Sequence, residues 1–222
     1  GETERAIEIV AEQGWTDLLL DIGRKLNASE KTSLELIASH LKRLKALPLA
    51  AEIYRKLGEE SQVVQLHIEA RDWQEAFRLA ENLPQILPSV HLQHAKWLAD
   101  SDQFLEAHEA YVLAGRPKEA HILLKNLADC AVEEERFSDA GYFTWLRSKQ
   151  LLKMMEMNPN ETSPQHINEF KLLLQLASIY YAYTTIHSYL REPFTSSPPL
   201  TLFNTSRFIA NQIIGSSPPK GI

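Results

Sequence analysis

The sequence predicts an all-α protein in which about six helical hairpins follow one another as an α-solenoid. Apolar residues recur at the three- and four-residue spacing of helices, and Pro and Gly separate these segments. Glycine is scarce, with eight in the chain, and β-branched residues do not form the alternating runs typical of strands. A short pattern of one aromatic residue, one acidic residue and one alanine also repeats along the chain.

The first six helices are predicted from apolar spacing and from residues that favour helix ends. Gly14 ends the first helix, and Ser29 is a candidate N-cap of the third. Pro48 suits the first turn of the fourth and Gly58 its exit. Asp72, followed by Glu three residues later, resembles a capping box before the sixth. The expected ranges are Glu2–Gln13, Trp15–Leu26, Ser29–Ala46, Pro48–Gly58, Glu59–Ala70 and Trp73–Leu83.

The same end signals continue in the second half. Asp102 is a candidate cap for a helix that Gly115 ends. The residue before proline resists the helical conformation, so Asn158-Pro159 must end the long helix that begins at Ser138. The expected ranges are Pro88–Ser101, Gln103–Ala114, Pro117–Glu135, Ser138–Asn158 and Pro164–Leu190.

The composition changes near the C-terminus. Five of the eleven prolines lie in the last 30 residues, around a short amphipathic stretch, Leu200–Ile214. We therefore expect residues 1–192 to form the helical solenoid and residues 193–222 to form a Pro/Ser-rich tail with a short amphipathic helix.

The repeated pattern is clearest at three places, where a polar residue, an aromatic residue, any residue, an acidic residue and an alanine follow one another. The aromatic residues are Trp73, Phe104 and Phe137, which are 31 and then 33 positions apart. Such spacing is close to the roughly 34 residues of a tetratricopeptide hairpin. Gly14-Trp15-Thr16-Asp17 is a weaker copy of the same pattern.

The pattern has a mechanical interpretation. A ring and an alanine three residues apart lie on one helical face. We expect the ring to fill the gap between hairpins, and the small alanine to let the next helix approach to about 8–10 Å. One hairpin cannot bury its apolar face alone, so stability is shared between neighbours.

Length, charge and cysteine usage exclude several protein classes. The 222 residues are 44% hydrophobic and 23% charged, as in a globular chain. A net charge of −6 argues against general phosphate binding to nucleic acid. A single cysteine excludes an intramolecular disulfide framework. No apolar run is long enough to cross a bilayer, and Gly1–Arg5 is no secretory signal, so we expect a section of a longer chain.

Candidate catalytic and metal-binding residues are few. His91 and His94 share a helical face, but no third ligand follows nearby. His108 begins a pattern like the zinc-protease helix, yet Val112 occupies the position of its second histidine. Ser39 and Lys42 match a serine–lysine pattern whose companion motifs are absent. No residue is therefore assigned to catalysis, cofactor binding or metal binding, and we expect no enzyme.

The remaining polar features are interpreted structurally. Cys130 is expected to be buried on a helix and inert. Lys42–Lys45 and the group Arg147, Lys149 and Lys153 are basic clusters, which usually lie on solvated helix faces. Three serines precede proline and are open to phosphorylation: Ser163, Ser197 and Ser217.

Several stretches resemble the tetratricopeptide region of the intraflagellar transport protein 122 family, subunits of intraflagellar transport complex A. The resemblance covers roughly residues 49 to 210 and fits Gly1–Lys25, whereas residues 28 to 47 match least well. The Tyr-rich and Glu-Pro-Phe-Thr stretches are the most specific. The matching stretches are Val63–Phe77, His94–Ala99, Phe104–Ala107, Ala114–Arg116, Ile179–Tyr183, Glu192–Thr195, Leu202–Asn204 and Ser206–Phe208.

The resemblance implies an architectural role. Members have paired β-propellers, then a helical solenoid, then a zinc-binding module, and this sequence would be the solenoid section. Complex A supports retrograde ciliary transport and ciliary entry of membrane receptors. The implied partners are other complex A subunits and receptor-cargo adaptors, with no nucleic acid and no direct membrane insertion. The implied locations are the cilium, its basal body and the cytoplasm.

Two alternatives remain open at this stage. A vesicle-coat subunit can carry a similar solenoid, and ciliary localisation of the full chain would separate it from the ciliary interpretation. A tetratricopeptide clamp for peptide C-termini needs Lys and Asn in register on the repeats, and the sequence has no repeated pair of this kind.

Overall fold

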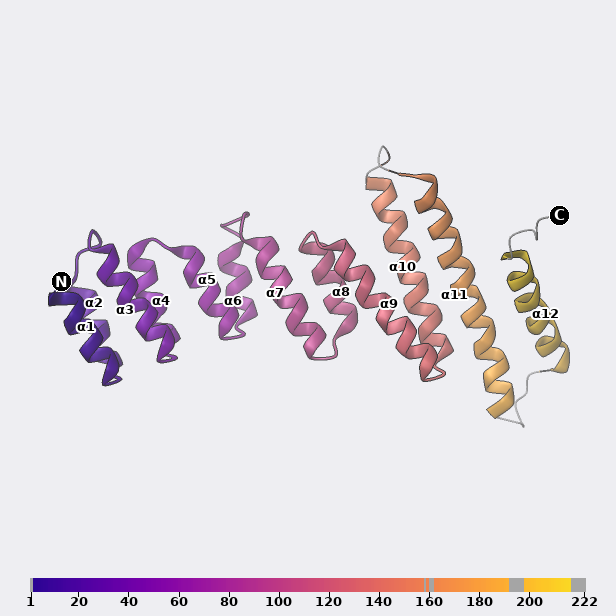
Figure 1. Cartoon of the computed structure of the whole chain (residues 1–222), viewed down its shortest axis with the longest axis horizontal. Helices are drawn as coiled ribbons and strands as arrows, with labels where there is room; N and C mark the ends of the chain where they lie inside the picture. The colour runs from indigo at the N-terminus through magenta and orange to yellow at the C-terminus, as the bar shows by residue number, and fades with distance from the viewer. Residues whose placement is uncertain (1, 158, 160–161, 192–197, 217–222) are drawn as a thin grey trace. The chain divides into compact units, whose positions relative to one another are not determined.

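A computed structural model describes residues 2–157, 159, 162–191 and 198–216 (Figure 1). The described residues form twelve helices and no strand, which confirms the all-α tetratricopeptide-type solenoid class. The helices belong to two compact units, Gly1–Arg116 and Pro117–Ile222.

The first unit contains eight short helices. Helices that follow one another in sequence pack against each other, as expected for consecutive hairpins (Figure 1). The helices are α1 (Glu2–Glu12), α2 (Thr16–Lys25), α3 (Lys31–Arg43), α4 (Leu47–Leu57), α5 (Glu60–Glu69), α6 (Trp73–Ala80), α7 (Leu87–Asp100) and α8 (Phe104–Leu113).

Two apolar clusters form the core of this unit. The larger cluster gathers mainly aliphatic side chains from α1 to α5, and its six largest fully buried members are Ile7, Leu19, Leu34, Ile37, Leu41 and Ile53. The smaller cluster joins α5, α6 and α7 through Val64, Ile68, Ala76, Ala80 and Val90. Burial of such side chains contributes about 1.5–3 kcal/mol each, so each hairpin depends on its neighbours for stability.

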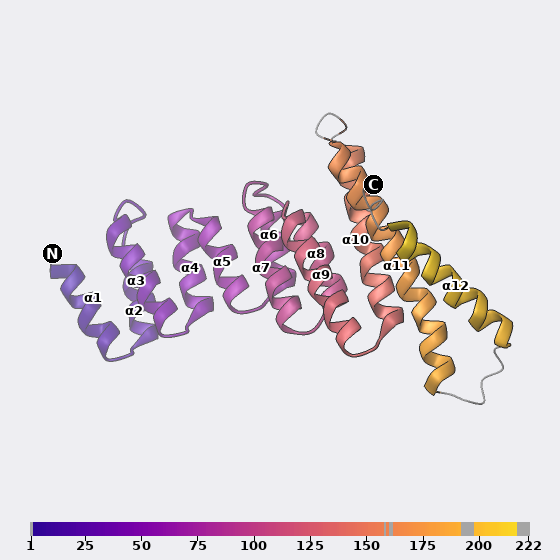
Figure 2. The same ribbon diagram turned by 45° about the vertical axis from the view of Figure 1, so that its right-hand side comes forward.

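The second unit contains four longer helices, α9 (Pro117–Glu133), α10 (Phe137–Met157), α11 (Pro164–Arg191) and α12 (Pro199–Ser216). Helix α10 packs between α9 and α11, and α12 lies against α11 (Figure 2). Ile209 of α12 is buried, and Gln175 Nε2 of α11 donates to the Gln212 carbonyl at 3.0 Å. The C-terminal amphipathic stretch therefore forms a helix that packs on α11.

The alanine of the repeated pattern is fully buried at all three copies. Ala76, Ala107 and Ala140 each have 0% exposure, and each lies three residues after the first residue of its helix. A larger side chain at these positions would push the packed helix away. The three alanines are therefore buried, as their predicted role requires.

Two of the three rings of the pattern, Trp73 and Phe137, pack on the next helix. The Trp73 ring lies 5.6 Å from that of Trp97 on α7, and the Phe137 ring lies 5.6 Å from that of Tyr183 on α11. Both rings are half-buried. The weaker copy differs, because Trp15 is 58% exposed.

Among the described residues, seven turns between helices share one backbone conformation. In each turn one residue has a positive φ, and the N–H of the next residue donates to a carbonyl five positions earlier, which is the Schellman arrangement. Three of these residues are the glycines Gly14, Gly58 and Gly115. The other four are Lys45, Arg71, Asp102 and Glu135.

Two predicted caps are wrong. Helix α3 begins at Lys31 after Glu30, so Ser29 is not its N-cap. Asp102 is the positive-φ residue of its turn, and Gln103 precedes α8 without a side-chain cap bond. In contrast, Asp72 does cap α6, since its side chain accepts from the Glu75 N–H. Asn158, where the long helix is predicted to end, lies outside the described residues. So do two of the serines that precede proline, Ser197 and Ser217.

Candidate functional site

The two histidines considered as metal ligands take part in ring packing. The His91 ring lies 4.9 Å from that of Phe77, and the His94 ring lies 4.8 Å from that of Trp73. Burial lowers the pKa of both histidines, and His91 lowers that of His94 further. In the described part of the chain, no group of three or more His, Cys, Asp or Glu side chains is placed to hold a metal ion.

Ser39 and Lys42, the serine–lysine pair, are each bonded to other groups. The Ser39 hydroxyl donates to the Leu36 carbonyl of its own helix at 2.7 Å. Lys42 Nζ lies 2.6 Å from Glu69 Oε1 on α5. An activated serine needs a base within hydrogen-bond reach, whereas here the hydroxyl is bound to a carbonyl and the amine to a carboxylate.

The structure corrects the prediction for Cys130, which is exposed on α9 rather than buried. The residue lies on the face of α9 that turns away from its buried alanines, Ala128 and Ala131. The three residues of the basic cluster on α10 differ in their exposure. Arg147 is half-buried while Lys149 and Lys153 are exposed.

Arg147 belongs to a polar group that joins three helices. Its Nη2 donates to His121 Nε2 of α9 at 3.0 Å, and the same His121 atom lies 3.8 Å from Glu169 Oε1 of α11. Burial lowers the pKa of His121, and the charge of Arg147 lowers it further. The three side chains therefore link α9, α10 and α11 as a structural contact.

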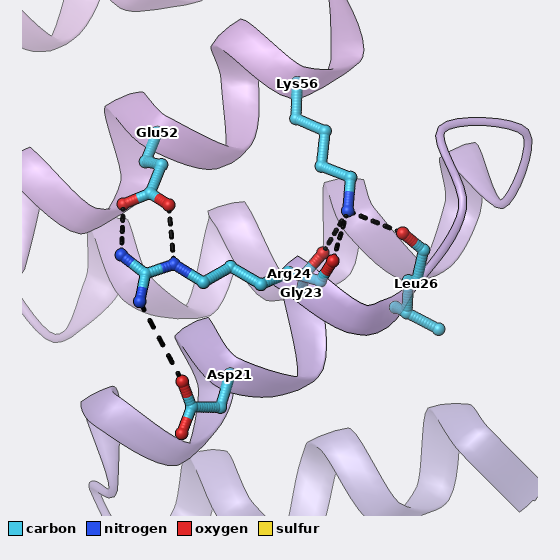
Figure 3. A network of polar contacts seen from close by, with 6 residues as sticks. All are labelled: Asp21, Gly23, Arg24, Leu26, Glu52 and Lys56. Carbon is cyan, nitrogen blue, oxygen red and sulfur yellow. Dashed lines mark hydrogen bonds and ion pairs between the residues drawn. The ribbon is translucent and has the colours of Figure 1, made fainter.

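A network of hydrogen bonds and ion pairs joins α2 to α4 (Figure 3). Lys56 Nζ donates to the carbonyls of Gly23, Arg24 and Leu26 at 2.9, 2.8 and 2.6 Å. These carbonyls belong to the end of α2, where no helical N–H remains to satisfy them and the helix dipole is negative.

A second contact joins the same two helices. Arg24 donates to both carboxylate oxygens of Glu52, at 2.7 and 2.9 Å, and this hydrogen bonding lowers the pKa of Glu52 (Figure 3). Asp21 lies 4.0 Å from the same guanidinium group. Sequence reasoning missed both contacts, because partners about 30 residues apart leave no local pattern.

Large apolar side chains are exposed on α11 and α12. Leu172 and Leu190 of α11 are 60% and 73% exposed, and Leu200 and Phe203 of α12 are 68% and 62% exposed. Exposed large apolar side chains are often found on protein contact surfaces. No helix in the described ranges is both long and apolar enough to cross a membrane. Leu200 and Phe203, which lie three residues apart on one face of α12, are therefore a candidate protein-contact surface.

Comparison with known proteins gives one matching family and several similar chains. The family described as IFT122, TPR domain matches residues 1–222. An intraflagellar transport protein 122 homolog of Danio rerio is 40% identical over 218 residues, which are 98% of this chain and 18% of that protein. The Homo sapiens homolog is also 40% identical over 218 residues, covering 98% and 17%.

A shorter similarity reaches a second intraflagellar transport protein. Intraflagellar transport protein 172 of Chlamydomonas reinhardtii is 32% identical over 71 residues, which are 32% of this chain and 4% of that protein. The chain spans less than a fifth of the length of the protein 122 homologs it matches.

Proposed function

The chain belongs to the IFT122 tetratricopeptide-domain family, and on this premise we propose that it is a non-catalytic scaffold section of intraflagellar transport complex A. The match of the family to the whole chain is the observation that carries the proposal. In this role the chain supports retrograde ciliary transport and the ciliary entry of membrane receptors through protein–protein contacts.

The contacts of the described side chains agree with a scaffold role. Ser39, Lys42, His91 and His94 form bonds or ring contacts within the helical stack. Several large apolar side chains of α11 and α12 are exposed, and apolar surface favours association. The proposed partners are other complex A subunits and receptor-cargo adaptors, at the cilium and its basal body.

The chain organisation is part of the same proposal. Residues 1–192 form the helical scaffold, and residues 193–222 form a tail that adds α12 to its end. Packing of α12 on α11 supports this view, because Ile209 is buried while Leu200 and Phe203 remain available for a partner.

Affinity purification from ciliated cells tests the proposal. The whole 222-residue chain carries a tag, and the captured proteins are identified by mass spectrometry. We expect other complex A subunits to be enriched over a tagged, unrelated helical-repeat control. Capture of vesicle-coat subunits without intraflagellar transport proteins would contradict it. Substituting Leu200 and Phe203 by Ser is expected to reduce the captured complex A subunits without changing the far-ultraviolet circular dichroism.

A further inference from the structure

Three large rings are exposed side by side on α10 and α11. Tyr142, Trp145 and Tyr181 are 39%, 38% and 44% exposed. The Tyr142 and Trp145 rings are stacked, with centroids 6.1 Å apart and planes at 27°. Tyr181 comes from α11 and its ring lies directly over Gly141, where a Cβ would meet three ring atoms at 3.2 Å. We name these three residues the ring patch.

Positive charge lies next to the ring patch. Lys149 Nζ lies 4.9 Å from the centre of the Trp145 ring, within the range of a cation–π contact. Lys153 follows one turn later and is exposed. Neither lysine makes an ion pair with any residue that the structure describes.

The most deeply buried face of α10 is a different one. The side of the helix that packs on its neighbours is lined by small or aliphatic residues, all at most 8% exposed: Ala140, Thr144, Ser148 and Leu151. Tyr142, Trp145, Lys149 and Leu152 lie at spacings of three, four and three, so they share one face of the helix. Leu152 is 38% exposed and extends the apolar surface.

We propose that the ring patch, with Lys149 and Lys153, binds an acidic peptide segment of a partner protein in which an apolar side chain lies next to a carboxylate. Tyr and Trp are the side chains that most often dominate protein contacts, because they offer large rigid surfaces. The apolar side chain packs on the rings while the carboxylate meets the two ammonium groups. The proposal names the partner chemistry for one surface of the scaffold, and so rests on the proposed function.

Charge favours a peptide over a membrane or a nucleic acid. Lipid-binding clusters carry about four to eight basic residues, whereas this face offers two lysines. The chain as a whole carries a net charge of −6, which disfavours a general attraction to phosphate backbones. An acidic peptide needs only the local complementarity that Lys149 and Lys153 supply.

Selection from a random phage-displayed peptide library on the whole chain tests the proposal. We expect the enriched peptides to share one or more Asp or Glu next to an apolar residue. The affinity of a synthetic copy, measured by fluorescence anisotropy, is expected to fall at least about tenfold with Trp145→Ala and with Lys149→Glu. Added salt is expected to weaken binding to the original chain.

A matched control uses an exposed apolar residue and an exposed lysine of α9. Ile122 is 55% exposed and Lys118 is exposed, so Ile122→Ala and Lys118→Glu should leave peptide binding within about twofold. Lys149→Glu changes only an exposed side chain, which keeps the test valid even if Trp145→Ala perturbs folding. Circular dichroism checks the fold of every variant.

Three outcomes would overturn the proposal: no enriched peptide, enriched peptides without acidic residues, or a peptide affinity that neither Trp145→Ala nor Lys149→Glu changes. Cosedimentation with phosphatidylserine–phosphatidylcholine vesicles that is lost on Trp145→Ala would assign the patch to a membrane and also overturn it. The two proposals can fail independently. If the unaltered chain captures no complex A subunits, the proposed function is contradicted, whereas the peptide-binding result is unaffected.

Discussion

Lys56 Nζ of α4 lies 2.6 Å from the carbonyl oxygen of Leu26, 30 residues earlier in the chain, and thereby caps the end of α2. The same ammonium group also donates to the carbonyls of Gly23 and Arg24. One side chain thus replaces the missing last N–H groups of α2 and binds it to α4.

Replacing Lys56 by Met is expected to destabilise the chain, because the aliphatic stem remains while three carbonyls lose their charged donor. Hydrogen bonds to a charged group contribute about 1.5–3 kcal/mol, and we expect a loss of this order in urea unfolding. Glu52→Gln on the same helix should have a smaller effect, since its ion pair with Arg24 is solvent-exposed. Equal losses for the two variants would contradict the capping role.

The turn conformation predicts opposite effects at two equivalent positions. Gly58 has φ 74°, and a Cβ added there would meet nothing within 4 Å, so Gly58→Ala should cost about 1 kcal/mol through backbone strain alone. Arg71 has φ 60° in the same kind of turn. Arg71→Gly should therefore raise the free energy of unfolding by up to about 1 kcal/mol. Thermal unfolding of the two variants checks the signs, and a shift in the same direction for both would refute the argument.

Gly23 marks a close approach between α2 and α4. A Cβ at this position would lie 2.5 Å from Ile53 Cδ1, in a fully packed region. We expect overpacking in Gly23→Ala to lower the free energy of unfolding by about 1–3 kcal/mol. The higher helix propensity of Ala offsets about 1 kcal/mol of this loss. In an Ile53→Val background the clashing methyl is gone, so the same change should be neutral or stabilising. A double-mutant cycle by urea unfolding measures the coupling, and strict additivity would show that the contact is absent.

The half-buried histidines His91 and His94 predict a loss of stability in mild acid. Burial lowers the pKa of His94 in the folded chain, with His91 adding to the shift, whereas an unfolded histidine titrates near 6.5. The unfolded state therefore binds more protons, and the free energy of unfolding falls as the pH drops below about 6.5. His94→Phe keeps a ring against Trp73 but cannot titrate. Its unfolding free energy should depend less steeply on pH over this range, and an unchanged slope would exclude His94 as a cause.

The sequence predicted the helices well wherever local chemistry determines them. Pro48, Gly58 and Pro117 lie at helix ends as expected, and the buried alanines follow from the repeated pattern. The cap predicted at Asp102 was wrong, because this residue occupies the positive-φ position of its turn. Four of the seven turns place a non-glycine residue there, and such a residue carries no helix-end signal of its own.

The polar network and the surface features could not be predicted in the same way. Lys56 and Leu26 meet only after α2, α3 and α4 have packed. Whether a residue such as Trp145 or Cys130 is exposed depends on which side of its helix faces the neighbours. In long helices with apolar residues all round, periodicity alone does not identify that side.

Urea unfolding of Ala76→Leu and Gln74→Leu tests most directly the claim that small residues let consecutive helices stack closely. Ala76 is fully buried while Gln74, two residues away on α6, is exposed. The account predicts a loss of about 1–3 kcal/mol for Ala76→Leu and a change within about 0.5 kcal/mol for Gln74→Leu. An Ala76→Leu chain as stable as the original would contradict it.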